Sequence, residues 1–197
     1  MTQSPGVLDI VSAREGHFRL ESGYHSSLWL DLDSLFADPV RIAPLARNLA
    51  RGIEPFEPSV VCGPLVGGAF LAQLVAKTLG VDFCYSEKLH GAETAGLYRT
   101  RYTVPAAFHG RIRHKKVALV DDVMSAGSSL RATFAALKEL HTIPVVAGAL
   151  LVLGSTGEGV FRGLSVPVVA GERREYQTWE PAHCPHCAAG IPLEVTG

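Results

Sequence analysis

The chain of 197 residues lacks several features that mark particular protein classes. Its four cysteines are too few for a disulfide framework, so we expect free thiols and a reducing, cytoplasmic environment. No uninterrupted run of about 18 apolar residues occurs, which argues against a membrane-spanning helix. The first residues, MTQSPG, have neither the basic nor the apolar segment of a signal peptide. These absences predict a soluble protein without a membrane partner.

An excess of charge of one sign is also missing. The formal net charge is −1, which gives no global attraction for nucleic acid or for an anionic membrane. A phosphate-rich ligand would therefore be held by local backbone amides and a few cations. Hydrophobic residues make up 47% and charged residues 19%, as is typical of a globular chain. The length fits one domain with a sizeable core.

Apolar strands alternate with helices over the second two thirds of the chain. Strands are predicted over residues 59–62, 81–85, 117–120, 145–153 and 166–170. Helices are predicted over residues 69–79, after the turn at residues 125–129, and near 158–164. Continuous apolar strands alternating with amphipathic helices favour an α/β fold with a mainly parallel sheet covered on both faces.

The N-terminal third has a different pattern. We expect a short helix over residues 7–14, then two strands at HFRLESG and SSLWLDLD around a turn. A helical pattern over residues 34–53 contains Pro39 and Pro44, which predicts a kink or a division into an initial turn and a main helix. Residues 86–115 are expected to be irregular. A long loop inside a compact domain is more often functional than accidental.

The most informative segment is KKVALVDDVMSAGSSLRATF, in which a buried strand ends at Asp121 and Asp122. A turn of small residues then leads into a helix. The carboxyl ends of parallel strands face the ligand crevice, and a helix start offers free N–H groups to a phosphate. The two acids would instead accept hydrogen bonds from hydroxyls or lie near a divalent metal. The segment therefore predicts a ribose-phosphate site; the alternative is a solvated strand end with an ordinary helix cap.

Two other phosphate-binding motifs are not matched. Residues 63–68 have the glycine spacing of a P-loop, but Ala69 and Phe70 stand where Lys and Ser/Thr are required. Gly154, Gly157 and Gly159 have the wrong order for a dinucleotide-binding fingerprint.

The acid pair and small-residue loop resemble the 5-phosphoribosyl-1-pyrophosphate (PRPP) signature of the type I phosphoribosyltransferases. The resemblance implies a mainly parallel twisted sheet flanked by helices, with a small N-terminal hood-like region and a mobile loop. It implies a base-binding region at about 1–55, a PRPP-binding core at about 56–175 and a tail at 176–197. Asp121 and Asp122 would bind the ribose. The 5′-phosphate would be bound by Ser125, Ala126, Gly127, Ser128 and Ser129.

Further segments are similar to orotate phosphoribosyltransferases in particular. The segment GHFRLESG and the following Ser26 look like the family's base pocket, which implies base contacts from Phe18, Ser22, Gly23 and Ser26. The pyrophosphate loop is matched by Gly63, Pro64, Leu65, Val66, Gly67 and Gly68. Lys88-Leu89-His90-Gly91 resembles the mobile catalytic loop, so that Lys88 (also a pyrophosphate contact), His90 and Asp122 would be catalytic. Arg131 matches the arginine that pairs with the orotate carboxylate, a two-pronged contact that suits guanidinium.

The resemblance implies a reaction and its partners. Magnesium, carried by PRPP rather than held in a protein cage, would assist transfer of the phosphoribosyl group to orotate, giving orotidine 5′-monophosphate and pyrophosphate. A homodimer is expected, with the mobile loop shared between active sites.

The sequence also departs from the orotate pattern. Cys84-Tyr85-Ser86 stands where an Arg-Lys pair usually precedes the mobile loop, and Glu21 occupies a position that is often basic. Transfer to another base (a purine or uracil) and a non-catalytic PRPP-binding regulator are therefore the alternatives. In a purely structural interpretation, Lys88 and His90 are solvated loop residues and Arg131 pairs with Glu139 or a neighbour on the helix surface.

The C-terminal tail contains Cys184 and Cys187 in the spacing of a metal chelate, with His183 or His186 as possible further ligands. A structural zinc site normally needs a second pair of ligands, and Cys62 and Cys84 lie on predicted core strands. Similar tails occur in some orotate enzymes. We therefore favour free thiols or packing, with zinc at Cys184 and Cys187 as the alternative.

Overall fold

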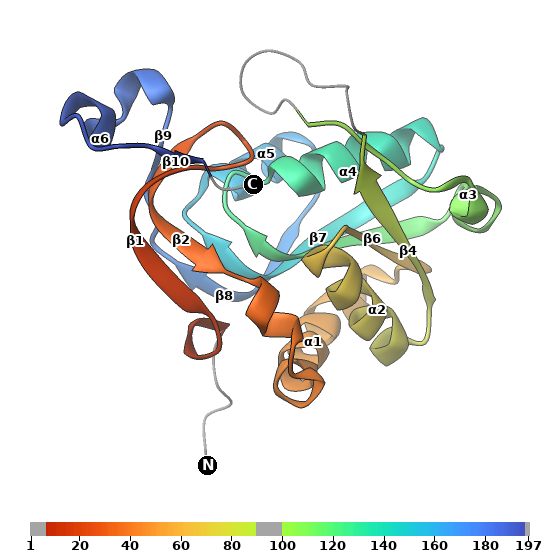
Figure 1. Cartoon of the computed structure of the whole chain (residues 1–197). Helices are drawn as coiled ribbons and strands as arrows, with labels where there is room; N and C mark the ends of the chain where they lie inside the picture. The colour runs from red at the N-terminus through yellow and green to blue at the C-terminus, as the bar shows by residue number, and fades with distance from the viewer. Residues whose placement is uncertain (1–6, 90–99, 196–197) are drawn as a thin grey trace.

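The computed structural model describes residues 7–89 and 100–195, which form two sheets (Figure 1). The larger, core sheet has six strands in the order β5-β4-β3-β6-β7-β8. All neighbours in it are parallel except β4 and β5, which pair antiparallel at one edge. Its strands are β3 (Val60–Pro64), β4 (Asp82–Lys88), β5 (Tyr102–Thr103), β6 (Lys116–Met124), β7 (Ile143–Leu153) and β8 (Val168–Arg174). The predicted α/β fold with a mainly parallel sheet is confirmed.

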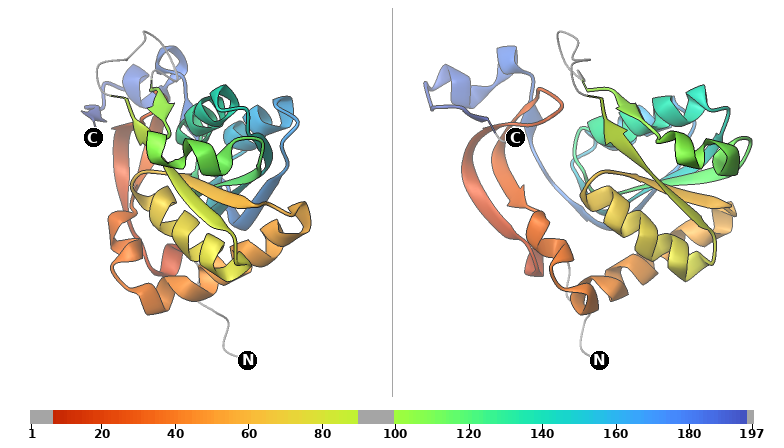
Figure 2. Two further views of the ribbon diagram at one scale, coloured as in Figure 1. Left: turned by 90° about the vertical axis from the view of Figure 1, so that its right-hand side faces the viewer. Right: turned by 45° about the vertical axis from the view of Figure 1, so that its right-hand side comes forward.

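Helices cover both faces of the core sheet (Figures 1 and 2). One face packs against α1 (Pro39–Ile53) and α2 (Gly67–Leu79), the other against α4 (Ser128–Glu139) and α5 (Thr156–Gly163). Successive residues of β6 alternate between the two sides: Ala118 and Val120 join the first cluster, Val117 and Leu119 the second. Because side chains of a strand point to alternate faces, a continuous apolar run is what a doubly covered strand requires.

The helical segment predicted over residues 34–53 is divided into an initial turn and a main helix, with the break just before Pro39. A short 3-10 helix, η2 (Asp33–Phe36), comes before Asp38, whose Oδ1 accepts hydrogen bonds from the amides of Val40 (3.0 Å) and Arg41 (3.2 Å). Pro39 then occupies the first turn of α1, where no amide donor is needed, and Pro44 lies inside the helix.

The second sheet, which we call the hood, combines both ends of the described chain. Its order is β10-β1-β2-β9, with β1 (Ser12–Arg19), β2 (His25–Asp31), β9 (Thr178–Trp179) and β10 (Glu194–Val195). Figure 2 shows it beside the core sheet, with the C-terminal segment running back to it. The predicted helix over residues 7–14 is wrong: a short 3-10 helix, η1 (Val7–Asp9), precedes β1, and Ser12 already pairs with Asp31. Strand pairing across the hairpin overrides the local helical pattern.

Other boundaries differ from the sequence-based ones. The segment expected to be irregular contains the end of β4, β5 and α3 (Ala106–Ile112), while residues 90–99 lie outside the described part. Strand β6 extends to Met124, because its pairing with β7 continues to Val152. The remaining short helices are η3 (Glu54–Phe56), η4 (Pro181–His183) and α6 (Pro185–Ala188). None of the described helices combines the length and apolar character needed to cross a bilayer.

Candidate active site

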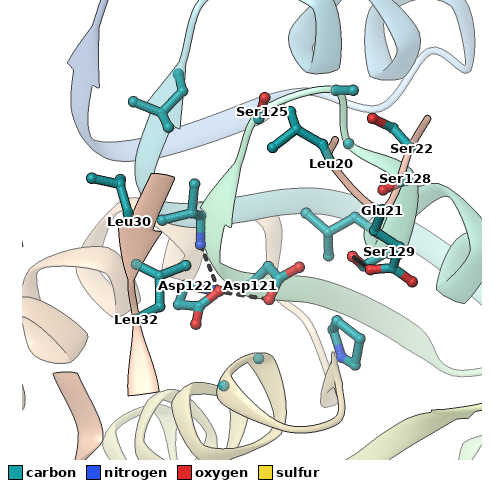
Figure 3. A pocket seen from close by; sticks show the side chains of 18 of the residues that line it. Leu20, Glu21, Ser22, Leu30, Leu32, Asp121, Asp122, Ser125, Ser128 and Ser129 are labelled. Carbon is teal, nitrogen blue, oxygen red and sulfur yellow. Dashed lines mark hydrogen bonds between the residues drawn. The ribbon is translucent and has the colours of Figure 1, made fainter. Parts of the chain in front are cut away.

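The main cavity lies where the strand order of the core sheet changes direction. The chain passes from β3 to β4 on one side and later returns to place β6 on the other side of β3. Ligands of open α/β sheets bind at such a point, beyond the carboxyl ends of the strands. A cavity of about 400 Å³ lies here, between the residues that follow β3, those at the end of β6, and the hood (Figure 3).

Asp121 and Asp122 lie on the floor of this cavity, near the end of β6. The amide of Asp122 donates to Asp121 Oδ1 (3.1 Å), and the amide of Val123 donates to Asp122 Oδ1 (2.8 Å), as the dashed lines of Figure 3 show. Asp121 is 7% exposed. Burial, and then the neighbouring Asp122, raises the pKa of the Asp121 carboxyl well above its usual range. The pair is thus poised to exchange hydrogen bonds with hydroxyl groups.

The glycine loop of residues 63–68 packs directly against these acids. A Cβ added to Gly67 would stand 2.1 Å from Asp122 Oδ2, and one on Gly68 would stand 2.7 Å from Asp121 Oδ1. A Cβ on Gly63 would meet the carbonyl oxygen of Gly68 at 1.9 Å. The glycines therefore let the loop fold on itself and let α2 begin against the acid pair. The peptide bond between Leu65 and Val66 is cis.

The small-residue loop leads from β6 into α4. Gly127, the residue before α4, has a φ of 72°, a left-handed conformation that glycine adopts without a steric cost. Ser125 lines the cavity, and its buried Oγ has no hydrogen-bond partner among the described residues. A buried hydroxyl left unpaired next to the start of a helix is suited to receive an oxyanion.

Glu21 connects the hood to the core wall of the cavity. Its carboxylate accepts hydrogen bonds from Tyr102 Oη (3.2 Å) and Ser129 Oγ (3.5 Å), and Lys88 Nζ lies 3.5 Å from it. Burial, with a contribution from the charge of Glu21, raises the pKa of the Tyr102 phenol, which therefore remains a donor. The predicted catalytic Lys88 is thus paired with an acid.

The described lining of the cavity is acidic. It contains Glu21, Asp31, Asp121 and Asp122, and among the described residues it contains no lysine or arginine. A ligand with several phosphates would meet backbone amides, hydroxyls and the neighbouring Lys88. The acids fit a ligand that brings its own divalent cation and several hydroxyl groups.

The structure brings most of the predicted binding residues to this one cavity. Those that line it are Ser22, Pro64, Leu65, Val66, Gly67, Gly68, Asp121, Asp122, Ser125, Ala126, Gly127, Ser128 and Ser129. The predicted residues that do not line it are Phe18, Gly23, Ser26, Gly63, Lys88 and Arg131. His90 lies outside the described residues.

Phe18 and Ser26 have structural surroundings in the hood. Phe18 is 1% exposed, with the guanidinium of Arg14 5.3 Å from its ring centre. Ser26 Oγ accepts a hydrogen bond from the amide of Leu28 (3.0 Å) and lies 2.5 Å from Tyr176 Oη, which donates to the Leu28 carbonyl (2.8 Å). Ser26 therefore holds Tyr176 at the cavity instead of facing it.

Arg131 lies on α4, at a neighbouring cavity of about 450 Å³. The two cavities share Tyr102 and Ser128, so they adjoin. Glu139, the partner considered for Arg131 from the sequence, lies 3.8 Å from Arg101.

Sequence reasoning missed part of the lining. Tyr102 and Tyr176 belong to segments that showed no motif, and only tertiary packing brings them to the cavity. Residues 28–32 also line it. The alternation in SSLWLDLD could have pointed to every second one of these residues, but not to five in a row.

Comparisons with known proteins agree with this geometry. The family model for the phosphoribosyl transferase domain matches residues 32–158. An orotate phosphoribosyltransferase of Thermotoga maritima is 31% identical over 93% of this chain and 90% of its own length. One of Carboxydothermus hydrogenoformans is 32% identical over the same shares of the two chains.

Solved structures extend the likeness to the fold. The adenine phosphoribosyltransferase of Thermoanaerobacter pseudethanolicus has a TM-score of 0.66 at 15% identity, covering 85% of this chain and 98% of its own. The orotate phosphoribosyltransferase of Aeropyrum pernix has a TM-score of 0.62 at 21% identity, and the match covers 82% of this chain and 87% of its own. At these identities the structures speak for the fold alone, and they include enzymes named for two different bases. Together with the family match and the sequence relatives, they show that the chain belongs to the type I phosphoribosyltransferase family of pentosyltransferases.

Proposed function

We propose that the protein transfers the 5-phosphoribosyl group of PRPP to orotate, giving orotidine 5′-monophosphate and pyrophosphate, with magnesium. One observation carries the PRPP part of the proposal. The acid pair, the glycine loop and the small-residue loop all line a single cavity at the β3–β6 switch point. The acid pair contacts the glycine loop and is followed along the chain by the small-residue loop, an arrangement that suits a ribose between two phosphate sites.

Each wall of the cavity has a role in the proposed reaction. Asp121 and Asp122 accept hydrogen bonds from the ribose hydroxyls, and the backbone amides and hydroxyls of residues 125–129 hold the 5′-phosphate. The loop of residues 63–68 receives pyrophosphate as the bond from the anomeric carbon to its oxygen breaks. A nitrogen of the base, after losing its proton, then bonds to that carbon with inversion. The acids also favour the positive charge that develops on the ring.

Magnesium is part of the proposal because of the acidic lining. A ligand bearing phosphates is repelled by the ionised acids of this lining unless a divalent cation accompanies it. When bound with PRPP, magnesium supplies charge neutralisation for the departing pyrophosphate. Lys88, released from Glu21, and His90 would assist the same step.

The choice of orotate rests on the named relatives and on Arg131. Both sequence relatives described above are orotate phosphoribosyltransferases, and each matches 93% of the chain. Arg131 lines a cavity that adjoins the main one, so a base reaching past Tyr102 and Ser128 would place its carboxylate near a guanidinium. Glu21 at the main cavity favours the alternative, an acceptor without a carboxylate such as a purine or uracil.

The proposal is tested by pyrophosphate release from PRPP and magnesium with orotate, uracil, adenine and xanthine as acceptors. We expect release with orotate. Arg131→Ala should raise the apparent KM for orotate by about 10- to 100-fold, the loss of one charge-assisted pair. Arg47→Ala, which removes an exposed arginine of α1, is the matched control and should leave KM unchanged.

The other outcomes are distinct. If the wild type ignores orotate but consumes PRPP with a purine or uracil, orotate is the wrong acceptor. If it binds PRPP and turns over no base, the protein is a PRPP-binding regulator. The homodimer with a shared loop and the cytoplasmic location stay predictions.

A further inference from the structure

Four side chains of types that can ligate a metal meet in the hood, away from the cavity. They are His17 of β1, His25 at the start of β2, and Cys184 and Cys187 of the C-terminal tail. Each offers one ligand atom, and these four atoms lie within 4.8 Å of one another. The second pair of ligands that the tail needs is therefore His17 and His25, more than 150 residues earlier in the chain. The neighbouring His183 and His186 are not part of the cluster.

Four of the six distances between the ligand atoms are close to those of a tetrahedral zinc site, and all six are within 4.8 Å. His17 Nε2 lies 3.0 Å from His25 Nδ1 and 3.4 Å from Cys184 Sγ. Cys187 Sγ lies 3.7 Å from His17 Nε2 and 3.3 Å from His25 Nδ1. Zn–N bonds of about 2.0–2.1 Å and Zn–S bonds of about 2.3 Å at tetrahedral angles put neighbouring ligand atoms roughly 3.3–3.8 Å apart. The four distances above come within a few tenths of an ångström of this range.

The ring of His17 is oriented by a second contact. Its Nδ1 lies 2.8 Å from the carbonyl oxygen of Ile191, which can only accept, so Nδ1 carries the proton. Nε2 is then the nitrogen with a free lone pair, and it faces the cluster. A backbone carbonyl that fixes the tautomer of a ligating histidine is a common outer contact of zinc sites.

The local fold delivers His17 to the cluster. Gly16 and His17 lie in a bulge, opposite a single residue of β2, between the pairs Glu15↔Leu28 and Phe18↔Ser26. Bulges re-aim a side chain, and here the rings of His17 and His25 come within 4.9 Å, centre to centre. His17, His25 and Cys184 are 2%, 4% and 3% exposed. The ring of His186 stacks on His17 at 5.4 Å and shields it.

We propose that His17, His25, Cys184 and Cys187 bind one structural zinc ion. All four positions are protein ligands and three are buried, as in a closed structural site, and the Cys₂His₂ set suits zinc. The hood sheet and the C-terminal tail are both small, since the outer strands β9 and β10 have two residues each. Small units of this kind are commonly stabilised by a metal.

The zinc ion would tie the C-terminal tail to both ends of the turn that reaches the active site. His17 and His25 flank residues 20–22, which line the main cavity. Zinc would therefore fix the position of Glu21 and Ser22 relative to the core wall without touching the substrate.

The test is the metal content of the full-length protein, which is independent of its activity. The protein is produced in zinc-supplemented medium, purified under reducing conditions without chelator, dialysed, and analysed by mass spectrometry of the elements. We expect about one zinc ion per chain in the wild type. The double variant Cys184→Ser/Cys187→Ser should lose it. His183→Ala is the matched control: this exposed tail histidine lies outside the cluster, so the variant should keep its zinc.

A second measurement covers the case in which the double variant does not fold. Metal-free, reduced wild-type protein is titrated with Co²⁺, and we expect the absorption bands of a tetrahedral site with thiolate ligands. Removal of zinc by a chelator should also lower the thermal unfolding temperature, and added zinc should restore it. A reduced, folded wild type that takes up neither zinc nor cobalt would overturn the proposal, as would a folded double variant that retains zinc.

Discussion

Most of the core wall of the cavity comes from two short segments of the chain, whereas the hood wall is assembled from both ends of the chain. The two segments lie within residues 64–68 and 121–130, each at the end of a buried parallel strand, and Tyr102 and Leu153 complete the core wall. The hood wall consists of residues 20–22 and 28–32, with Tyr176 held against it by Ser26. We infer that the core wall carries the chemistry common to the family and the hood wall adapts the site to its base. The predictions below separate the two walls.

The largest effect is expected from the acid pair of the core wall. Asp121→Asn and Asp122→Asn should each lower turnover by at least about tenfold, or roughly 1.4 kcal/mol of barrier, because amides are weaker acceptors for the ribose hydroxyls. Steady-state pyrophosphate release and thermal unfolding are measured together. Retained activity with a sharp fall in melting temperature would make the pair structural.

A smaller effect is expected from crowding the same wall. In Gly67→Ala the new methyl group would lie on the Asp122 carboxylate, so we expect a loss of about 1–3 kcal/mol of unfolding free energy and weaker PRPP binding. Gly159→Ala is the matched control, because a Cβ there meets nothing within 4 Å. Urea unfolding and calorimetry measure the two quantities. Equal behaviour of the two variants would contradict the close approach of the loop to the acids.

In the hood wall, Glu21→Gln should act in the opposite direction. Removing this carboxylate frees Lys88 and reduces repulsion of the phosphates, so PRPP should bind about two- to fivefold more tightly, as expected for a partly exposed ion pair. Glu15→Gln, which changes an exposed acid of β1, should leave binding unchanged. Weaker binding in Glu21→Gln would show that this acid accepts hydrogen bonds from the ligand.

The smallest effect concerns the pH dependence of stability. Burial raises the folded-state pKa of Asp121, so its protonated form stabilises the fold, fully below its ordinary value of 3.8 and progressively less as the pH rises through the folded pKa. Without ligand, the unfolding free energy of the wild type should therefore fall relative to that of Asp121→Asn as the pH increases above 3.8. Urea unfolding of both proteins over a pH series measures this. If the difference in unfolding free energy between the two proteins does not change with pH, the pKa of Asp121 is not raised in the folded protein.

The contrast between the walls also explains what could be predicted from the sequence. Strand, acid pair, loop and helix lie within residues 116–139, so their order alone placed Asp121, Asp122 and Gly127 together. The glycine loop was found for the same reason. Tyr102 and Tyr176 were missed because only tertiary packing brings them to the cavity.

The hood was harder to predict from the sequence, because contacts between distant parts of the chain also determine its structure. The first residues of β1, Ser12–Arg14, were predicted as part of a helix, since the pairing of Ser12 with Asp31 is not a local property of residues 7–14. The side chains grouped with Cys184 and Cys187 were also hidden, because His17 and His25 are distant in the chain and His17 lies in a bulge. Bulges and long-range strand pairs leave little trace in a single sequence.

The central claim is that the β3–β6 switch point binds PRPP, and calorimetric titration of the folded wild type with PRPP and magnesium tests it most directly. We expect micromolar affinity, on the order of 8 kcal/mol, and little binding when magnesium is left out. Absence of any binding by a folded sample in the presence of magnesium would contradict the account.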